Sequence, residues 1–227
     1  MNAHSPAAVL WDMDGTLIDS EPYWIAAEIE LCARFGVGWT KEDGLRQVGN
    51  ALVKTATELR ERGVNMPLDA ITEHLTGRVT MQVRERTPWQ MDAFDLLNAV
   101  LAAGIPCALV TMSYRQLADA LLARVPEAFA VVVTGDEVVN GKPDPEAYLL
   151  AAKRLGVDIT KCVAFEDSPA GVASALASGA RTVGIRRHVA LAAHPELSRV
   201  RNLKKTTIAD IREIAAGRVI DDFVRRK

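Results

Sequence analysis

The chain has 227 residues, of which 49% are hydrophobic, and a formal net charge of −2. This near-neutral charge gives no electrostatic reason to expect binding to nucleic acid or to an anionic membrane. No apolar run approaches the roughly 20 residues that cross a bilayer, and residues 1–6 lack the pattern of a signal peptide. Cys32, Cys107 and Cys162 lie scattered in apolar contexts, which favours buried thiols in a reducing compartment. We therefore expect a cytoplasmic protein, either a monomer or a homodimer.

The first expected strand is the apolar run 7–10, and two carboxylates, Asp12 and Asp14, follow it. In an extended chain, side chains two residues apart point to the same side, and Gly15 permits a sharp turn just after them. Paired carboxylates at the carboxyl end of a strand suit a cation, or a nucleophile with an acid/base partner. A turn rich in Asp and Gly is the alternative interpretation of these residues alone.

Helical periodicity dominates the next part of the chain. Apolar spacing and the breaks at Gly and Pro predict helices over 21–35, 45–48, 51–62 and 68–86. No convincing strand occurs there, so we expect a small helical domain over 20–86. It is inserted into a second domain made of 1–19 and 87–227.

Short apolar strands alternate with helices in the rest of the chain. Strands are expected over 106–111, 130–135, 162–167 and 182–185. Helices are expected over 93–102, 115–123, 145–155, 170–177 and 208–216. Segment 188–205 is expected to be a loop with a short edge strand, and 186–188 a solvated loop. Continuous apolar strands that alternate with helices predict an α/β fold, a Rossmann-like parallel sheet covered on both faces.

Reactive side chains gather where three expected strands end. Open α/β sheets bind ligands at the carboxyl ends of their strands, so we expect one site there. The clusters are Asp12 with Asp14, Thr111 with Ser113, and Glu166 with Asp167.

Four short motifs, in this order, resemble those of the haloacid dehalogenase-like phosphotransferases. They are Asp12-Met13-Asp14-Gly15-Thr16-Leu17, Thr111-Met112-Ser113, Lys142 before a proline, and Phe165-Glu166-Asp167. The resemblance spans about residues 7–186. A helical insertion just after the first motif resembles the cap of the branch that contains beta-phosphoglucomutase and many sugar-phosphate phosphatases.

The resemblance implies a phosphatase that acts on a small phosphorylated metabolite through an aspartyl-phosphate. Asp12 would be the nucleophile and Asp14 the acid/base. Thr111 would bind a phosphoryl oxygen, with Met112 contributing its amide and Ser113 lying beside it. Lys142 would offset negative charge, although a solvated surface lysine is the alternative for this residue alone.

The resemblance also implies a magnesium site. Its ligands would be Asp12, the backbone carbonyl of Asp14, and Asp167, with Glu166 binding directly or through water. Oxygen ligands of this kind suit a hard cation. The alternative for Glu166 and Asp167 is a pair of N-cap residues for the next helix.

Substrate specificity is expected in the helical insertion, around Glu21, Trp24, Gly49 and Asn50. Trp24 and Asn50 are candidate substrate-binding residues, although Trp24, like Trp39, could instead belong to the hydrophobic core of the insertion.

A beta-phosphoglucomutase-like phosphosugar mutase is the main alternative function. Such mutases carry a histidine in the first cap helix and an arginine after a Gly-Val-Ser step, where this chain has Trp24 and Leu52. Haloacid dehalogenase activity itself is disfavoured by Asp14 and by the Glu166–Asp167 pair. A binding protein on the same fold is disfavoured because every motif position is present.

Overall fold

A six-stranded parallel sheet forms the core of the computed structural model, which describes residues 5–224. The strand order is β3-β2-β1-β4-β5-β6, which confirms the predicted α/β fold. The strands are β1 (Val9–Trp11), β2 (Cys107–Val110), β3 (Val131–Val133), β4 (Val163–Glu166), β5 (Arg181–Ile185) and β6 (Leu197–Val200). β6 is the edge strand expected within 188–205.

The register aligns the carboxyl ends of the central strands. Trp11 of β1 lies opposite Leu109 of β2 and Phe165 of β4. The Asp12 amide then donates to the Phe165 carbonyl at 3.1 Å. The residues that follow these strands therefore meet at one edge of the sheet.

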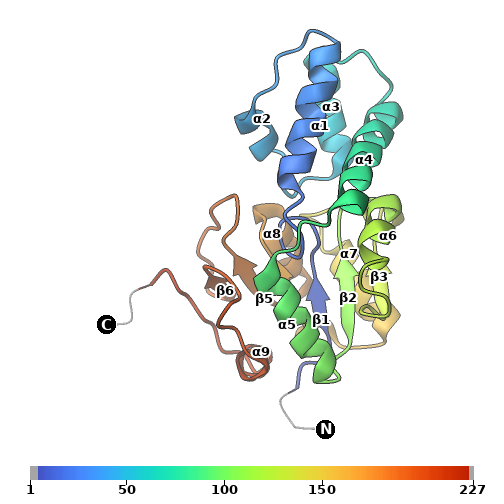
Figure 1. Cartoon of the computed structure of the whole chain (residues 1–227). Helices are drawn as coiled ribbons and strands as arrows, with labels where there is room; N and C mark the ends of the chain where they lie inside the picture. Colours follow the sequence, from blue (N-terminus) through green and yellow to red (C-terminus); the bar gives the residue numbers. More distant parts are fainter. Residues whose placement is uncertain (1–4, 225–227) are drawn as a thin grey trace.

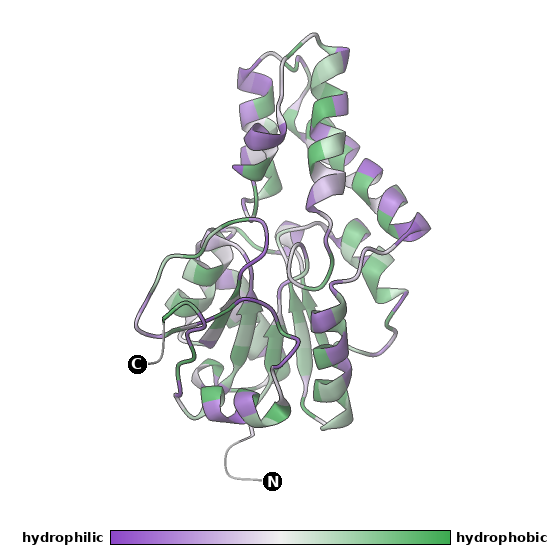
Figure 2. Cartoon of the chain, turned by 60° about the vertical axis from the view of Figure 1, so that its left-hand side comes forward, coloured by the Kyte–Doolittle hydropathy of each residue, from purple (hydrophilic) through white to green (hydrophobic). Residues whose placement is uncertain are grey.

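Helices cover both faces of the sheet, as the continuous apolar strands predict (Figure 1). Val9 and Trp11 face one side with α5 (Met91–Ala102), α6 (Arg115–Leu122) and α9 (Ile208–Ala215). Leu10 faces the other side with α7 (Glu146–Leu155) and α8 (Pro169–Ser178). Two 3-10 turns, Gly135–Glu137 and Ile159–Lys161, complete this part. Figure 2 shows the apolar strands enclosed between these helices.

Four helices stand beyond the carboxyl edge of the sheet (Figure 1). We call them the cap helices: α1 (Glu21–Arg34), α2 (Lys41–Leu45), α3 (Leu52–Glu61) and α4 (Leu68–Glu85). The helix predicted over 45–48 was wrong, because α2 begins earlier. Thr40 accepts a hydrogen bond from the Asp43 amide at 3.1 Å, and the Asp43 carboxylate accepts one from the Thr40 amide at 2.7 Å. This capping box starts α2 at Lys41.

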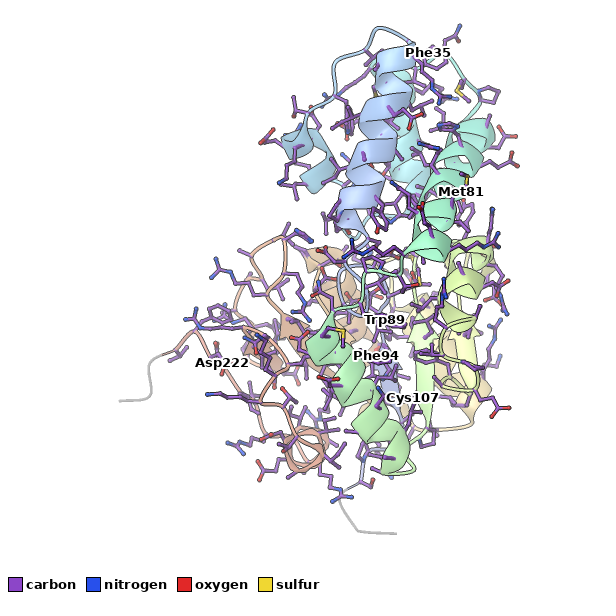
Figure 3. All side chains as sticks on the ribbon, in the orientation of Figure 1. Phe35, Met81, Trp89, Phe94, Cys107 and Asp222 are labelled. Atoms are coloured by element: carbon purple, nitrogen blue, oxygen red, sulfur yellow. The ribbon has the colours of Figure 1, made fainter. Side chains whose placement is uncertain are left out.

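The two linkers to the cap helices run side by side. Ile18 and Trp89 form an antiparallel bridge, and the Asp19 amide donates to the Pro88 carbonyl at 2.7 Å. The Trp89 ring packs on Phe94 of α5 with centroids 4.6 Å apart, so the second linker is anchored where it enters the helix (Figure 3). The division into two domains at residues 20 and 86 stays a prediction.

Segment 186–188 is a loop in which Arg186 and His188 are exposed, as expected, but the Arg187 side chain is largely enclosed against α5. Its two terminal nitrogens donate to the Asp92 carboxylate at 2.7 and 3.1 Å. Asp92 also accepts the Leu203 amide at 2.8 Å, so this pair ties α5 to the segments around β6. Neighbouring His188 bonds to Asp19 at 2.6 Å. Within residues 5–224, no helix is both long and apolar enough to cross a membrane.

The buried Arg187–Asp92 pair leads to a stability prediction. We expect Asp92→Asn to lower the free energy of unfolding by about 3 kcal/mol, because it leaves a buried guanidinium without a counter-charge. Urea titration followed by circular dichroism measures this change. Asp95→Asn, on an exposed position of the same helix, is the control and should change the free energy by less than about 0.5 kcal/mol. Equal effects of the two variants would contradict the assignment.

Candidate active site

The three predicted clusters meet at the carboxyl edge of the sheet. Asp12 follows β1, Thr111 follows β2, and Glu166 ends β4. Lys142 reaches the same place from the loop between β3 and α7. One cavity between the sheet edge and the cap helices is lined by the predicted residues Asp12, Asp14, Trp24, Asn50, Thr111, Met112, Ser113 and Lys142.

Lys142 is a buried ion-pair residue, not a solvated lysine, with 5% of its surface exposed. Its Nζ donates to Asp12 Oδ1 at 2.7 Å, to Glu166 Oε1 at 2.6 Å and to the Val110 carbonyl at 3.0 Å. Burial disfavours the ammonium, but the two carboxylates outweigh that effect and hold the pKa of Lys142 above its usual range. All three donors of the ammonium are therefore used within the protein.

Three carboxylates crowd this single ammonium. Asp12, Glu166 and Asp167 can each place one oxygen within 4.8 Å of the others. Burial, with the Glu166 charge, raises the pKa of Asp12 to about 7. Burial and the Asp12 and Glu166 charges raise the pKa of Asp167 well above its usual range. One ammonium does not balance three carboxylates, so the protein alone leaves the cluster short of positive charge.

The oxygens of this cluster fit a divalent cation. Asp167 Oδ1 accepts a bond from Thr16 Oγ1 at 3.2 Å, whereas its buried Oδ2 has no hydrogen-bond partner in the described part of the chain. Glu166 Oε1 is already occupied by Lys142 and by the Tyr148 hydroxyl at 2.6 Å. A buried oxygen without a partner, in an all-oxygen donor set, suits a hard metal ion.

Glycines make room for these carboxylates. A Cβ at Gly15 would lie 2.1 Å from Asp167 Oδ2, and one at Gly171 would lie 2.0 Å from Glu166 Oε2. Gly15 also has φ +81°, which disfavours other residues. Gly15 within the first motif and Gly171 after the fourth are therefore required by close approach to the acidic cluster.

The Asp14 carboxylate points away from the cluster. Its Oδ1 accepts bonds from Ser20 Oγ at 2.5 Å and Trp24 Nε1 at 3.1 Å. Its Oδ2 accepts bonds from Thr111 Oγ1 at 3.2 Å and Ser113 Oγ at 2.7 Å. Asp14 thus connects the second motif to α1, and Trp24 contacts a site residue instead of lying only in the core of the cap helices. Metal binding through the Asp14 carbonyl stays a prediction.

Ser168, not the acidic pair, caps helix α8. Its hydroxyl accepts a hydrogen bond from the Gly171 amide at 3.0 Å, so the N-cap interpretation of Glu166 and Asp167 was wrong.

Ser168 also contacts the loop between α2 and α3. A Cβ at Gly49, whose φ is +78°, would lie 2.3 Å from Ser168 Oγ. Glycine there lets the cap helices approach the sheet closely, and the neighbouring Asn50 lines the cavity.

The sequence analysis missed part of the cap side of the cavity. Glu28, Gly44, Gln47 and Thr55 line it together with Glu21. The spacing of Glu21, Trp24 and Glu28 along α1 places them on one helical face, which is the signal that could have identified Glu28. Buried Tyr148 was also missed, because α7 offers only an apolar stripe.

Glu21 and Glu28 are buried carboxylates that face the cavity. Glu21 is 6% exposed, and its carboxylate has no hydrogen-bond or ion-pair partner among residues 5–224. Burial, with the charge of Asp14, raises the pKa of Glu21 to about 8. The pKa of Glu28 is raised to about 7, mainly by burial. Neither group has a cation beside it in the described structure.

Comparison with known proteins agrees with this geometry. The chain is 34% identical over 181 residues to a phosphorylated carbohydrates phosphatase from Thermotoga maritima, covering 76% of this chain and 81% of the relative. The crystal structure of CbbY from Rhodobacter sphaeroides in complex with phosphate is similar over 91% of this chain and 99% of that chain, with a TM-score of 0.80 and 26% identity. A beta-phosphoglucomutase from Clostridium difficile, covering 93% of this chain and 97% of that chain, has a TM-score of 0.79. Its 18% identity shows a shared fold only.

A family model provides the assignment. The model for haloacid dehalogenase-like hydrolases matches residues 6–179, which is most of the chain and includes all four motifs. Together with the Thermotoga relative, it confirms the predicted enzyme class, a phosphatase. The chain belongs to the haloacid dehalogenase-like hydrolase family.

Proposed function

We propose that this enzyme is a magnesium-dependent phosphatase that hydrolyses a small phosphorylated sugar or sugar alcohol through an aspartyl-phosphate on Asp12. The observation that carries the proposal is the position of Asp12. Its Oδ1 is held by Lys142, while its Oδ2 has no hydrogen-bond partner among the residues described and the side chain lines the cavity. An oriented carboxylate with one free oxygen is suited to attack phosphorus.

The reaction follows from the groups around Asp12. An oxygen of Asp12 forms a bond to phosphorus while the bond to the substrate oxygen breaks, and Asp14 gives that oxygen a proton. Asp14 next takes a proton from a water molecule that attacks the phosphorus of the aspartyl-phosphate. This step releases inorganic phosphate and restores the Asp12 carboxylate.

Several groups support these steps. Asp12 and Asp167 would hold Mg²⁺, with Glu166 and the Asp14 carbonyl, and the ion would neutralise charge on the phosphoryl oxygens. Thr111 and Ser113 would bind phosphoryl oxygens with the hydroxyls that now donate to Asp14. Lys142 orients Asp12. The three cysteines are free and buried, which supports a reducing, cytoplasmic location.

The cap side of the cavity supports a hydroxylated substrate. Glu21, Glu28, Gln47 and Thr55 offer hydrogen-bonding groups there. Among the described residues that line the cavity, Lys142 is the one cation, and its donors are used. A substrate with one phosphate and several hydroxyls fits, in keeping with the carbohydrate substrates named for the Thermotoga relative.

The mutase alternative lacks the groups it needs. Trp24 donates its indole N–H to Asp14, and an indole does not exchange that proton as a histidine does. Leu52, which lines the cavity, is apolar. The two positions that carry the mutase roles therefore offer neither a histidine to relay a proton nor a cation for a second phosphate, and hydrolysis is favoured.

Replacement of the nucleophile tests the proposal directly. We expect Asp12→Asn to fold and to retain less than about one per cent of wild-type activity, since an amide neither attacks phosphorus nor binds Mg²⁺ well. Phosphate release from a panel of sugar phosphates measures the loss. Asp95→Asn should be as active as wild type. A folded Asp12→Asn enzyme with substantial turnover would contradict the assignment.

Metal removal tests the cation site. Activity should be lost in excess EDTA and return with Mg²⁺, whereas Zn²⁺, which prefers nitrogen and sulfur ligands, should restore it poorly. Asp167→Asn should raise the Mg²⁺ concentration needed for half-maximal activity. Full activity in excess chelator would refute the metal dependence.

Product analysis separates the phosphatase from the mutase. Incubation with beta-glucose 1-phosphate and a trace of the sugar bisphosphate should release inorganic phosphate or leave the sugar phosphate unchanged. Enzymatic assay of glucose 6-phosphate provides the measurement. Rapid formation of glucose 6-phosphate would show that other cap residues supply the mutase roles.

A further inference from the structure

Glu28 is a buried carboxylate on the cap side of the cavity. It is 3% exposed, and its Oε2 accepts a hydrogen bond from Trp39 Nε1 at 2.9 Å. Its other oxygen, Oε1, has no hydrogen-bond partner within residues 5–224, and the residue lines the cavity. One oxygen is therefore fixed by the protein, and the other is available to a ligand.

The surroundings of Glu28 do not neutralise it. The guanidinium of Arg62 lies 4.7 Å from the centroid of the Trp39 ring, and Trp39 is the residue that bonds to Glu28. Arg62 is used elsewhere, because it pairs with Asp43 at 3.0 Å and with Glu58 at 2.9 Å. Glu58 itself adds negative charge near Glu28.

The backbone beside Glu28 is shaped to admit this side chain. A Cβ on Gly44 would lie 2.9 Å from Glu28 Oε2 and 2.7 Å from Ile25 Cγ1. Glycine is therefore required at position 44 because the Glu28 and Ile25 side chains approach the backbone there, and not because of the backbone conformation. A larger residue at position 44 would displace the carboxylate from its place against Trp39.

A role in stability alone does not explain a carboxylate at this position. Trp39 needs one acceptor, and the amide oxygen of glutamine has the same length and would serve it. Burying a carboxylate against a neutral indole costs free energy that glutamine would avoid. A residue that lowers the stability of the fold, where a more stable alternative exists, is typical of a functional site.

The position of Glu28 indicates which part of a substrate it meets. Trp24, one helical turn earlier on α1, bonds to Asp14 in the active site. Four residues advance a helix by about 6 Å, and α1 runs away from the sheet (Figure 1). This distance matches a short chain of carbon atoms between the phosphoryl group and a distal hydroxyl.

We propose that Glu28 is a specificity-determining residue, positioned by Trp39 and Gly44, whose carboxylate accepts a hydrogen bond from a substrate hydroxyl remote from the phosphoryl group. This inference rests on the proposed phosphatase function. It also assigns a preference against a second anionic group, because the described lining near Glu21 and Glu28 holds no cation that could compensate a distal phosphate or carboxylate.

Glu28→Gln tests the proposal with an isosteric, neutral side chain. The assay uses hexose, hexitol and pentose monophosphates, monodeoxy analogues of the best of these, and para-nitrophenyl phosphate, which lacks hydroxyls. Glu28→Gln should lower kcat/KM for the best sugar phosphate about ten-fold or more, mainly through KM, as expected for a lost charge-assisted hydrogen bond. Turnover of para-nitrophenyl phosphate should change less than about two-fold. Glu73→Gln, on an exposed position of α4, should match wild type throughout.

The deoxy analogues separate a contact with substrate from a structural effect. One analogue lacks the hydroxyl that Glu28 binds. For that analogue, Glu28→Gln should not lower kcat/KM any further, because the hydrogen bond is already missing from the substrate side. An equal loss with every analogue, or no loss with the parent sugar phosphate, would overturn the proposal. Failure of the wild-type enzyme to hydrolyse any phosphate ester would instead refute the proposed function.

Thermal unfolding checks that Glu28→Gln is folded. It also measures how far the Glu28 carboxylate lowers the stability of the wild-type protein. Between about pH 4.5 and pH 7 the folded protein holds a proton on Glu28 that the unfolded chain releases, so this residue lowers stability as the pH rises. Glu28→Gln should therefore melt at a higher temperature than wild type near pH 8, with the difference vanishing near pH 4.5. A lower melting temperature near pH 8 would support a purely structural role and overturn the proposal.

Discussion

Charge balance at the carboxyl edge of the sheet is the constraint on which the active site depends. Lys142 places one ammonium between Asp12 and Glu166 and uses its third donor on the Val110 carbonyl. Three buried carboxylates around one buried ammonium would be strongly destabilising in isolation. The arrangement is tolerable because β1, β2 and β4 hold their carboxyl ends in register and because a further cation can bind beside Asp167. The cluster is therefore suited to a metal ion, which would supply the positive charge that the protein lacks there.

Close packing follows from the same constraint. Gly15 and Gly171 admit the carboxylates of Asp167 and Glu166, and Gly49 admits Ser168 beneath the cap helices. Each glycine lowers the stability of its segment, since it has the greatest backbone freedom in the unfolded chain. The chain keeps them where side chains from separate elements must approach within contact distance. The paired linkers add to this, since the bridge between Ile18 and Trp89 fixes the base from which α1 and α4 rise.

The sheet and the core motifs could be predicted from the sequence because each is marked by residues that are close together in the chain. Apolar runs mark β1, β2 and β4, and reactive residues follow each run directly. Long-range partners could not be predicted in this way. Arg187 and Asp92 are 95 positions apart, and nothing near Arg187 indicates a buried counter-ion. The start of α2 was missed for a different reason: its apolar pattern is weak, and the capping box of Thr40 and Asp43 decides the boundary.

The two groups of buried carboxylates differ in what can neutralise them. In the core, Asp12, Glu166 and Asp167 converge within 4.8 Å, which suits one small cation. In the cap helices, Glu21 and Glu28 lie seven residues apart on one face of α1, about two turns of helix. That separation is too great for one metal ion but suits a molecule that spans the cavity. Under the proposed function, the core would provide chemistry common to phosphate esters, whereas the spacing of acceptors along α1 would decide which ester fits. Selectivity could then change through α1 and α2 without disturbing Lys142 and its partners.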